Sequence, residues 1–189
     1  MKLDKLTKEI WGCNRCELYK TKTNYVIGQG DENTNIMFIG EAPGHNEDLQ
    51  GLPFVGKAGQ IFDELLGSIN LNRGDVYICN LLKCRPPNNR QPEKTEIESC
   101  SHFLNTQIDI IKPKVICCMG NFATTYIMKK YGMTDKITGI SKLHGKIFKF
   151  SGLYGTIDII PLYHPAVATY APEMKEALLN DFKILKEKE

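Results

Sequence analysis

The stretch Asn35-Ile-Met-Phe-Ile-Gly40, continued by Glu41-Ala-Pro-Gly44, decides the fold of this chain. A short apolar run that ends at a glycine is typical of a buried strand. The two glycines and the proline in and after that run predict a rigid turn with Glu41 at its head. Ligands of parallel sheets bind beyond the carboxyl ends of the strands, so residues in this turn are candidates for function.

The segments around this strand alternate between helix and strand. Apolar residues at helical spacing predict helices over residues 3–12, 58–69, 92–112, 121–130 and 172–185. Short apolar runs predict further strands over residues 75–82, 115–119, 147–150 and 156–162. This alternation favours an α/β fold, a mostly parallel sheet covered by helices on both faces, within one domain spanning residues 1–189.

Three polar side chains follow three of the predicted strands. Glu41 heads the first turn, Asn80 comes at the end of the second strand, and His164 follows the last long strand in Tyr163-His-Pro-Ala166. Because the ends of parallel strands meet at one edge of a sheet, the carboxylate, the amide and the imidazole are expected to lie together. They form a plausible active-site trio.

Composition excludes several classes of protein. The chain has 189 residues, of which 42% are hydrophobic and 24% charged, a globular balance that excludes a mostly disordered protein. No stretch approaches the about 20 apolar residues of a membrane-spanning helix. The charged start, Met1-Lys-Leu-Asp-Lys-Leu-Thr-Lys, is not a signal peptide, so a cytoplasmic location is expected.

Positive charge is local, since the net charge is only +2. That value excludes a protein that wraps nucleic acid electrostatically, but not a compact reader with a basic patch. Lys83, Arg85, Arg90 and Lys94 crowd one loop, and residues 136–149 hold four lysines and no acid. Near the strand-end trio, such groups predict a rim that grips phosphates.

The seven cysteines fall into two groups. Cys79, Cys117 and Cys118 lie within apolar runs and are expected to be buried as small hydrophobic residues. Cys13 and Cys16 form a C-x-x-C pair, and Cys84 and Cys100 would complete four ligands. Four sulfurs suit either a tetrahedral zinc ion or an iron–sulfur cluster, and spacing alone does not choose between them.

These motifs together resemble the family-four uracil-DNA glycosylases, the iron–sulfur members of the uracil-DNA glycosylase superfamily. The resemblance is carried by Gly40-Glu-Ala-Pro-Gly44 with Glu47-Asp48, Gly51-Leu-Pro-Phe-Val-Gly56, Asn80-Leu-Leu-Lys-Cys-Arg-Pro-Pro87 and His164-Pro-Ala166. It extends in order from Cys13 to Ala166. It implies a three-layer α/β/α sandwich with a central, mostly parallel four-stranded sheet.

The resemblance also implies a hydrolase that flips uracil out of DNA and breaks its N-glycosidic bond, as in base excision repair. Glu41 would position or activate the water, and His164 would donate a hydrogen bond to uracil O2. Asn80 would read the uracil edge, Phe54 would stack on the base, and backbone groups of Gly40, Glu41 and Ala42 would line the pocket. Cys13, Cys16, Cys84 and Cys100 would ligate a [4Fe-4S] cluster through an N-terminal cluster-binding segment.

Further hypotheses concern the exclusion of thymine, the contacts with DNA and the partners of the chain. Glu47 would help exclude the 5-methyl group of thymine, although an acid at a helix start can also serve backbone amides. Lys83, Arg85, Arg90, Pro165 and Ala166 are expected to contact DNA. The partner is uracil-containing DNA, single- or double-stranded, with no membrane and no obligate protein partner, so a monomer is expected.

Two alternatives compete with turnover. A protein of the same fold could bind uracil-DNA without releasing it, and some relatives trap the DNA covalently through a histidine in the loop after the second strand. Residues 83–94 contain no histidine, which favours turnover. An iron–sulfur electron carrier is the other alternative, but it would leave the strand-end trio unused.

Overall fold

The structure is a computed structural model, and it describes residues 2–152 and 155–187. Its strands are β1 (Gln29–Gly30), β2 (Ile36–Gly40), β3 (Tyr77–Asn80), β4 (Val115–Met119), β5 (Phe148–Gly152) and β6 (Gly155–Leu162). Its α-helices are α1 (Leu3–Trp11), α2 (His45–Gln50), α3 (Lys57–Ser68), α4 (Lys94–Ile111), α5 (Asn121–Lys130), α6 (Ile140–Leu143), α7 (Val167–Tyr170) and α8 (Met174–Lys183). Short 3-10 turns are η1 (Glu17–Lys20), η2 (Pro87–Asn89), η3 (Thr134–Lys136) and η4 (Ile184–Glu187).

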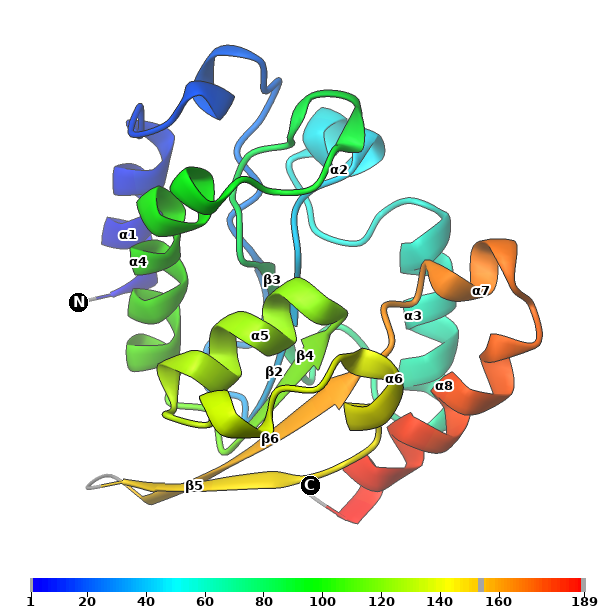
Figure 1. The fold of residues 1–189 in the computed structure, drawn as a ribbon. Helices are drawn as coiled ribbons and strands as arrows, with labels where there is room; N and C mark the ends of the chain where they lie inside the picture. The colour runs from blue at the N-terminus through cyan, green and yellow to red at the C-terminus, as the bar shows by residue number, and fades with distance from the viewer. Residues whose placement is uncertain (1, 153–154, 188–189) are drawn as a thin grey trace.

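One twisted sheet forms the middle of the molecule, with strand order β1-β3-β2-β4-β6-β5 (Figure 1). The four central strands pair in parallel, with Gly40 opposite Asn80 at the end of the β2–β3 ladder. The expected α/β sandwich and its four-stranded parallel centre are therefore present. The described sheet has six strands rather than four, because β1 and β5 add an antiparallel strand at each edge.

Alternate residues of the central strands point into two hydrophobic cores. Met37 and Ile39 of β2 face the core beneath α1, α4 and α5, whereas Ile36 and Phe38 face the core beneath α3 and α8. Figure 1 shows these helices on the two sides of the sheet. Burial on both faces explains why this strand reads as a continuous apolar run and not as an alternating one.

Most elements begin and end near their predicted limits. Two helices begin two residues later than predicted: α4 at Lys94 rather than at Pro92, and α8 at Met174 rather than at Pro172. Glu93 is the N-cap, and its side chain and that of Glu96 form a capping box that satisfies the first free amides. Cys79, Cys117 and Cys118 are fully buried in β3 and β4, as expected.

No helix in the described part of the chain is both long and apolar enough to cross a membrane.

Candidate active site and cysteine cavity

A cavity opens where the central parallel strands end, and we call it the strand-end cavity. It is lined by Glu41, Ala42, Pro43, Gly44, Glu47, Phe54, Ala58, Asn80, Pro86, Asn89, Arg90, His164 and Ala166. Glu41, Asn80 and His164 are thus brought to one site, as expected from the strand order. Glu41 follows β2, Asn80 is the last residue of β3, and His164 comes shortly after the end of β6.

Phe54 forms one wall of the strand-end cavity. Its ring stacks on the His164 ring with centroids 5.5 Å apart and planes 26° apart. Gly40 lies behind it, where a Cβ atom would come within 2.9 Å of Phe54 Cζ and 2.3 Å of Asn80 Oδ1. Gly40 is therefore a spacer that lets the aromatic ring and the amide approach the end of β2 closely.

The backbone of Phe54 has φ of 54°, a left-handed conformation that is rare for a bulky residue. Neighbouring groups hold it there. Glu47 Oε1 accepts hydrogen bonds from the N–H groups of Val55 and Gly56, both at 2.9 Å. The Arg73 guanidinium donates to the carbonyl oxygens of Pro53 and Phe54 and pairs with Asp63. The strained conformation of Phe54 persists because several hydrogen bonds to the neighbouring backbone hold it in place.

The structure therefore shows that Glu47 binds the backbone of the Phe54 loop, a contact that the sequence does not reveal. It lies in the first turn of α2, an element missing from the sequence prediction, and its carboxylate bridges to the Phe54 loop instead of capping its own helix. The acidic pair Glu47-Asp48 after Gly44 was the available signal for a helix start.

The ionisable groups of the cavity differ in electrostatic environment. Burial lowers the pKa of His164 to about 4, so its ring is neutral near pH 7. The Ala166 N–H donates to Nδ1 of that ring at 3.2 Å, which leaves the ring proton on Nε2. Burial raises the pKa of the Glu41 carboxyl above its ordinary range. Perturbed groups gathered in a cleft are typical of functional sites.

Asn80 presents a buried amide to the same cavity. The residue is 2% exposed, and its side chain makes no hydrogen bond to any residue that the structure describes. The residue lines the strand-end cavity, and its amide atoms are not fully shut off from that space. The amide is therefore available for a ligand that offers both a donor and an acceptor.

The residues predicted to contact DNA differ in their exposure, and only some of them border the strand-end cavity. Ala166 and Arg90 line the cavity, and Arg90 also forms a bidentate pair with Glu96. Arg85 is half-buried and bonds to Asn89 and His45. Lys83 and Pro165 are buried, which corrects their placement on a DNA-facing rim. Lys83 is held inside because its ammonium bonds to two buried oxygen atoms.

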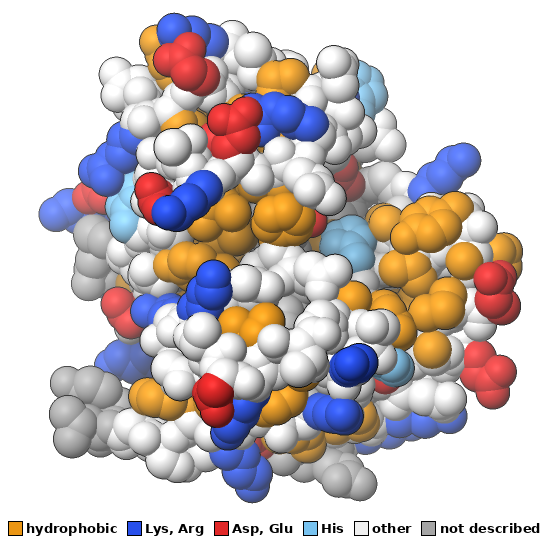
Figure 2. Space-filling model, viewed as in Figure 1, with side chains coloured by type: hydrophobic (Ala, Val, Ile, Leu, Met, Phe, Trp, Pro, Cys, Tyr) orange, Lys and Arg blue, Asp and Glu red, His pale blue; other side chains and the backbone are white. Residues whose placement is uncertain are grey.

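Positive side chains on the face shown in Figure 2 are dispersed among neutral ones and do not form one band. The lysines of residues 136–149 are all exposed.

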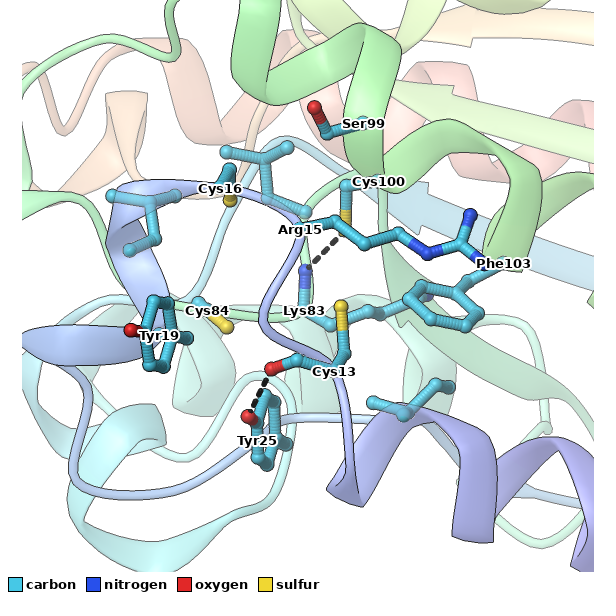
Figure 3. A pocket seen from close by; sticks show the side chains of 13 residues that line it. Cys13, Arg15, Cys16, Tyr19, Tyr25, Lys83, Cys84, Ser99, Cys100 and Phe103 are labelled. Carbon is cyan, nitrogen blue, oxygen red and sulfur yellow. Dashed lines mark hydrogen bonds between the residues drawn. The ribbon is translucent and has the colours of Figure 1, made fainter.

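A second cavity contains the other cysteine group, and we call it the cysteine cavity. Its lining is Ile10, Cys13, Arg15, Cys16, Leu18, Tyr19, Tyr25, Leu82, Lys83, Cys84, Ser99, Cys100 and Phe103. The four cysteines come from the turn after α1, the loop after β3, and α4, and Figure 3 shows their sulfur atoms around a common space. No described group of three or more His, Cys, Asp or Glu side chains is arranged to hold a metal ion.

The cysteine cavity is mostly apolar, and its polar contacts are few. The Lys83 N–H donates to Cys100 Sγ at 3.3 Å, and the Tyr25 hydroxyl donates to the Cys13 carbonyl (Figure 3). Burial raises the pKa of the Cys16 and Cys84 thiols and raises that of Cys100 to about 11. Metal binding at such thiols would release protons.

Comparisons with known proteins agree with this geometry. Residues 27–183 match the family described as the uracil DNA glycosylase superfamily. The chain is 47% identical to a type-4 uracil-DNA glycosylase of Archaeoglobus fulgidus, over 96% of this chain and 90% of that protein. It is 46% identical to one of Saccharolobus solfataricus, over 98% and 85%.

A solved structure is similar in fold alone. The solution NMR structure of a candidate uracil DNA glycosylase from Methanosarcina acetivorans is 14% identical, with a TM-score of 0.50, and covers 85% of this chain and 98% of that one.

Proposed function

The chain belongs to the type-4 uracil-DNA glycosylases of the uracil DNA glycosylase superfamily, and from this premise we infer that it hydrolyses the N-glycosidic bond of uracil in DNA. The observation that carries the inference is the meeting of Glu41, Asn80 and His164 in one cavity with Phe54 as its aromatic wall. The roles below are the ones that this arrangement supports best.

Recognition begins with base flipping, because the glycosidic bond of a stacked base is out of reach. Phe54 offers its ring face to the flipped base. The unpartnered Asn80 amide can donate to uracil O4 while accepting from N3–H. Cytosine presents the opposite pattern at these two positions, so the amide orientation that pairs with uracil would leave the cytosine groups and those of Asn80 unpaired.

Bond cleavage leaves positive charge on the sugar and negative charge on the uracil. The neutral His164 ring carries its proton on Nε2 and can donate it in a hydrogen bond to uracil O2. Such a donor stabilises charge that develops only in the transition state and contributes roughly 3 kcal/mol, about a hundredfold in rate. When ionised, Glu41 orients the attacking water and favours the positive sugar.

The cysteine cavity fits an iron–sulfur cluster as a proposed cofactor. Four thiols from three separate elements surround one mostly apolar space, and thiolates are the ligands that these clusters prefer. A four-iron cluster is larger than a single ion, so its ligands need not converge on one point. Cys13, Cys16, Cys84 and Cys100 would hold a [4Fe-4S] cluster, whose chemistry here is structural: it would tie the N-terminal segment to the Cys84 loop and to α4.

The decisive experiment separates turnover from trapping. The protein is incubated with a labelled single- or double-stranded oligonucleotide that contains one uracil, and the products are run on a denaturing gel with and without alkali. The proposal predicts free uracil and an alkali-sensitive site. A covalent protein–DNA band without free uracil would replace it with a non-turnover binder. Iron and sulfide analysis of the same sample tests the cluster, for which about four irons per chain are expected.

A further inference from the structure

Lys83 is a buried lysine whose ammonium has no carboxylate partner among the described residues. Its side chain is 1% exposed. The ammonium donates to the backbone carbonyl of Asn80 at 2.7 Å and to Gln107 Oε1 at 2.6 Å, both neutral acceptors. Burying an unpaired charge is expensive, so an apolar residue would serve a purely structural position better.

The second partner of Lys83 is itself fixed. Gln107 lies on α4 and is 0% exposed. Its amide nitrogen donates to the Ile27 carbonyl at 2.9 Å and to the Tyr77 hydroxyl at 3.0 Å. These two bonds determine which way the amide faces, so Gln107 Oε1 is directed at the lysine. The ammonium is therefore held in one place by the interior of the protein.

Lys83 also borders the cysteine cavity. Its N–H donates to Cys100 Sγ at 3.3 Å, and the next residue in the chain is Cys84 (Figure 3). Thiolate-ligated clusters are anionic, so a cluster bound in this cavity would place negative charge beside a residue that carries positive charge. The backbone of Lys83 thus contacts the cysteine cavity, and its side chain contacts the backbone carbonyl of Asn80, a residue that lines the strand-end cavity.

The Asn80 amide depends on its backbone for position. Its side chain bonds to no described residue, so no other side chain orients it. What is fixed is the peptide group after it, through the Lys83 ammonium on the Asn80 carbonyl and the bond from Leu81 N–H to the Gly40 carbonyl at 2.9 Å. A shift of that peptide group would move the amide within the strand-end cavity.

We propose that Lys83 is a positioning residue for Asn80 and joins the cysteine cavity to the uracil-reading edge of the strand-end cavity. This proposal rests on the proposed function, because it assigns Asn80 to uracil. It explains why a buried cation stands three residues after Asn80 and directly before Cys84. Lys83 acts only through Asn80 and does not touch the substrate.

The test is a double-mutant cycle of Lys83→Met with Asn80→Ala in full-length, iron-loaded protein. Lys83→Met in the parent is expected to lower kcat/KM for a uracil oligonucleotide about 10- to 100-fold, since a 1 Å misplacement of a positioned group costs on the order of a hundredfold. In the Asn80→Ala background the same change should cost less than about threefold, because groups that act through one another are not additive.

A second readout does not involve turnover. Affinity for an oligonucleotide that carries non-hydrolysable 2′-fluoro-deoxyuridine should weaken about tenfold or more in Lys83→Met and remain unchanged for the same strand with thymine. The visible absorption of the cluster reports whether the variant is loaded. Lys5→Met, an exposed lysine of α1, is the matched control and should equal the parent in every measurement.

Additive effects of Lys83→Met and Asn80→Ala, in a parent that excises uracil, would overturn this proposal alone. A parent without excision would overturn the proposed function and this proposal with it. If Lys83→Met does not fold, Gln107→Leu replaces it, because it removes the acceptor that holds the ammonium. Gln107→Leu must then show the same dependence on Asn80, and independence from Asn80 would refute the proposal.

Discussion

Substitution of Gly40 by alanine tests the geometry of the strand-end cavity most sharply. The new Cβ atom would lie 2.3 Å from Asn80 Oδ1 and 2.9 Å from Phe54 Cζ. Ordinary contact begins at 3.4 Å, so the amide oxygen must retreat by about 1 Å and the ring by about half as much. Displacement of a positioned group by 1 Å costs about a hundredfold, so kcat/KM for uracil should fall by about that factor, or roughly 2.7 kcal/mol.

The assay is single-turnover excision from a labelled uracil oligonucleotide, with thermal unfolding of the same sample. Gly67→Ala is the matched control, because Gly67 lies in α3 with nothing within 4 Å of its would-be Cβ atom. It should retain parental activity and gain about 0.5–1 kcal/mol of stability. Activity of Gly40→Ala within threefold of the parent would refute the close packing of Asn80 and Phe54 around the end of β2.

Four further predictions concern individual residues. Glu47→Ala should loosen the Phe54 loop, so uracil excision should fall about tenfold and thymine should be released. Glu47→Gln is the control, because it keeps an acceptor for the N–H groups of Val55 and Gly56. An unaltered preference for uracil in Glu47→Ala would refute the part of Glu47 in thymine exclusion. Because burial raises the pKa of Glu41, excision should decline as pH falls through that raised value. The ionised Glu41 carboxylate also destabilises the fold, so Glu41→Gln should raise the melting temperature at pH 7, with a gain that disappears below pH of about 4, where the carboxyl is protonated in both states. Cys84→Ser should lose iron and weaken folding and DNA binding together, and a folded, colourless, fully active variant would contradict a structural cluster.

The central sheet could be predicted because its signals are local. The run Ile36–Gly40 is buried on both faces and therefore apolar throughout, and glycine or a polar residue marks the end of each of β2, β3 and β4. The trio followed from topology, since parallel strands deliver their ends to one edge. The short elements were missed: β1 has two residues, and α2 has six with no apolar periodicity to reveal it.

The burial of Lys83 could not be predicted from its neighbours. A lysine in a loop with Arg85 and Arg90 reads as a surface charge, because lysine is almost never fully buried. Its partners are a backbone carbonyl three residues earlier and Gln107 on a distant helix, and no sequence pattern relates them. The hydrogen bonds from Arg73 to the Phe54 loop could not be predicted for the same reason, since they join residues that are 19 and 20 positions apart in the sequence.

The most direct test of the central account is base release from oligonucleotides that contain one uracil, one thymine or one cytosine at the same position, with the parent protein and with Glu41→Ala and His164→Ala. Alkali-induced breakage at uracil alone, reduced about a hundredfold or more in each variant, is the predicted result. Parental rates of uracil release in either variant would contradict the assignment of excision to the strand-end cavity.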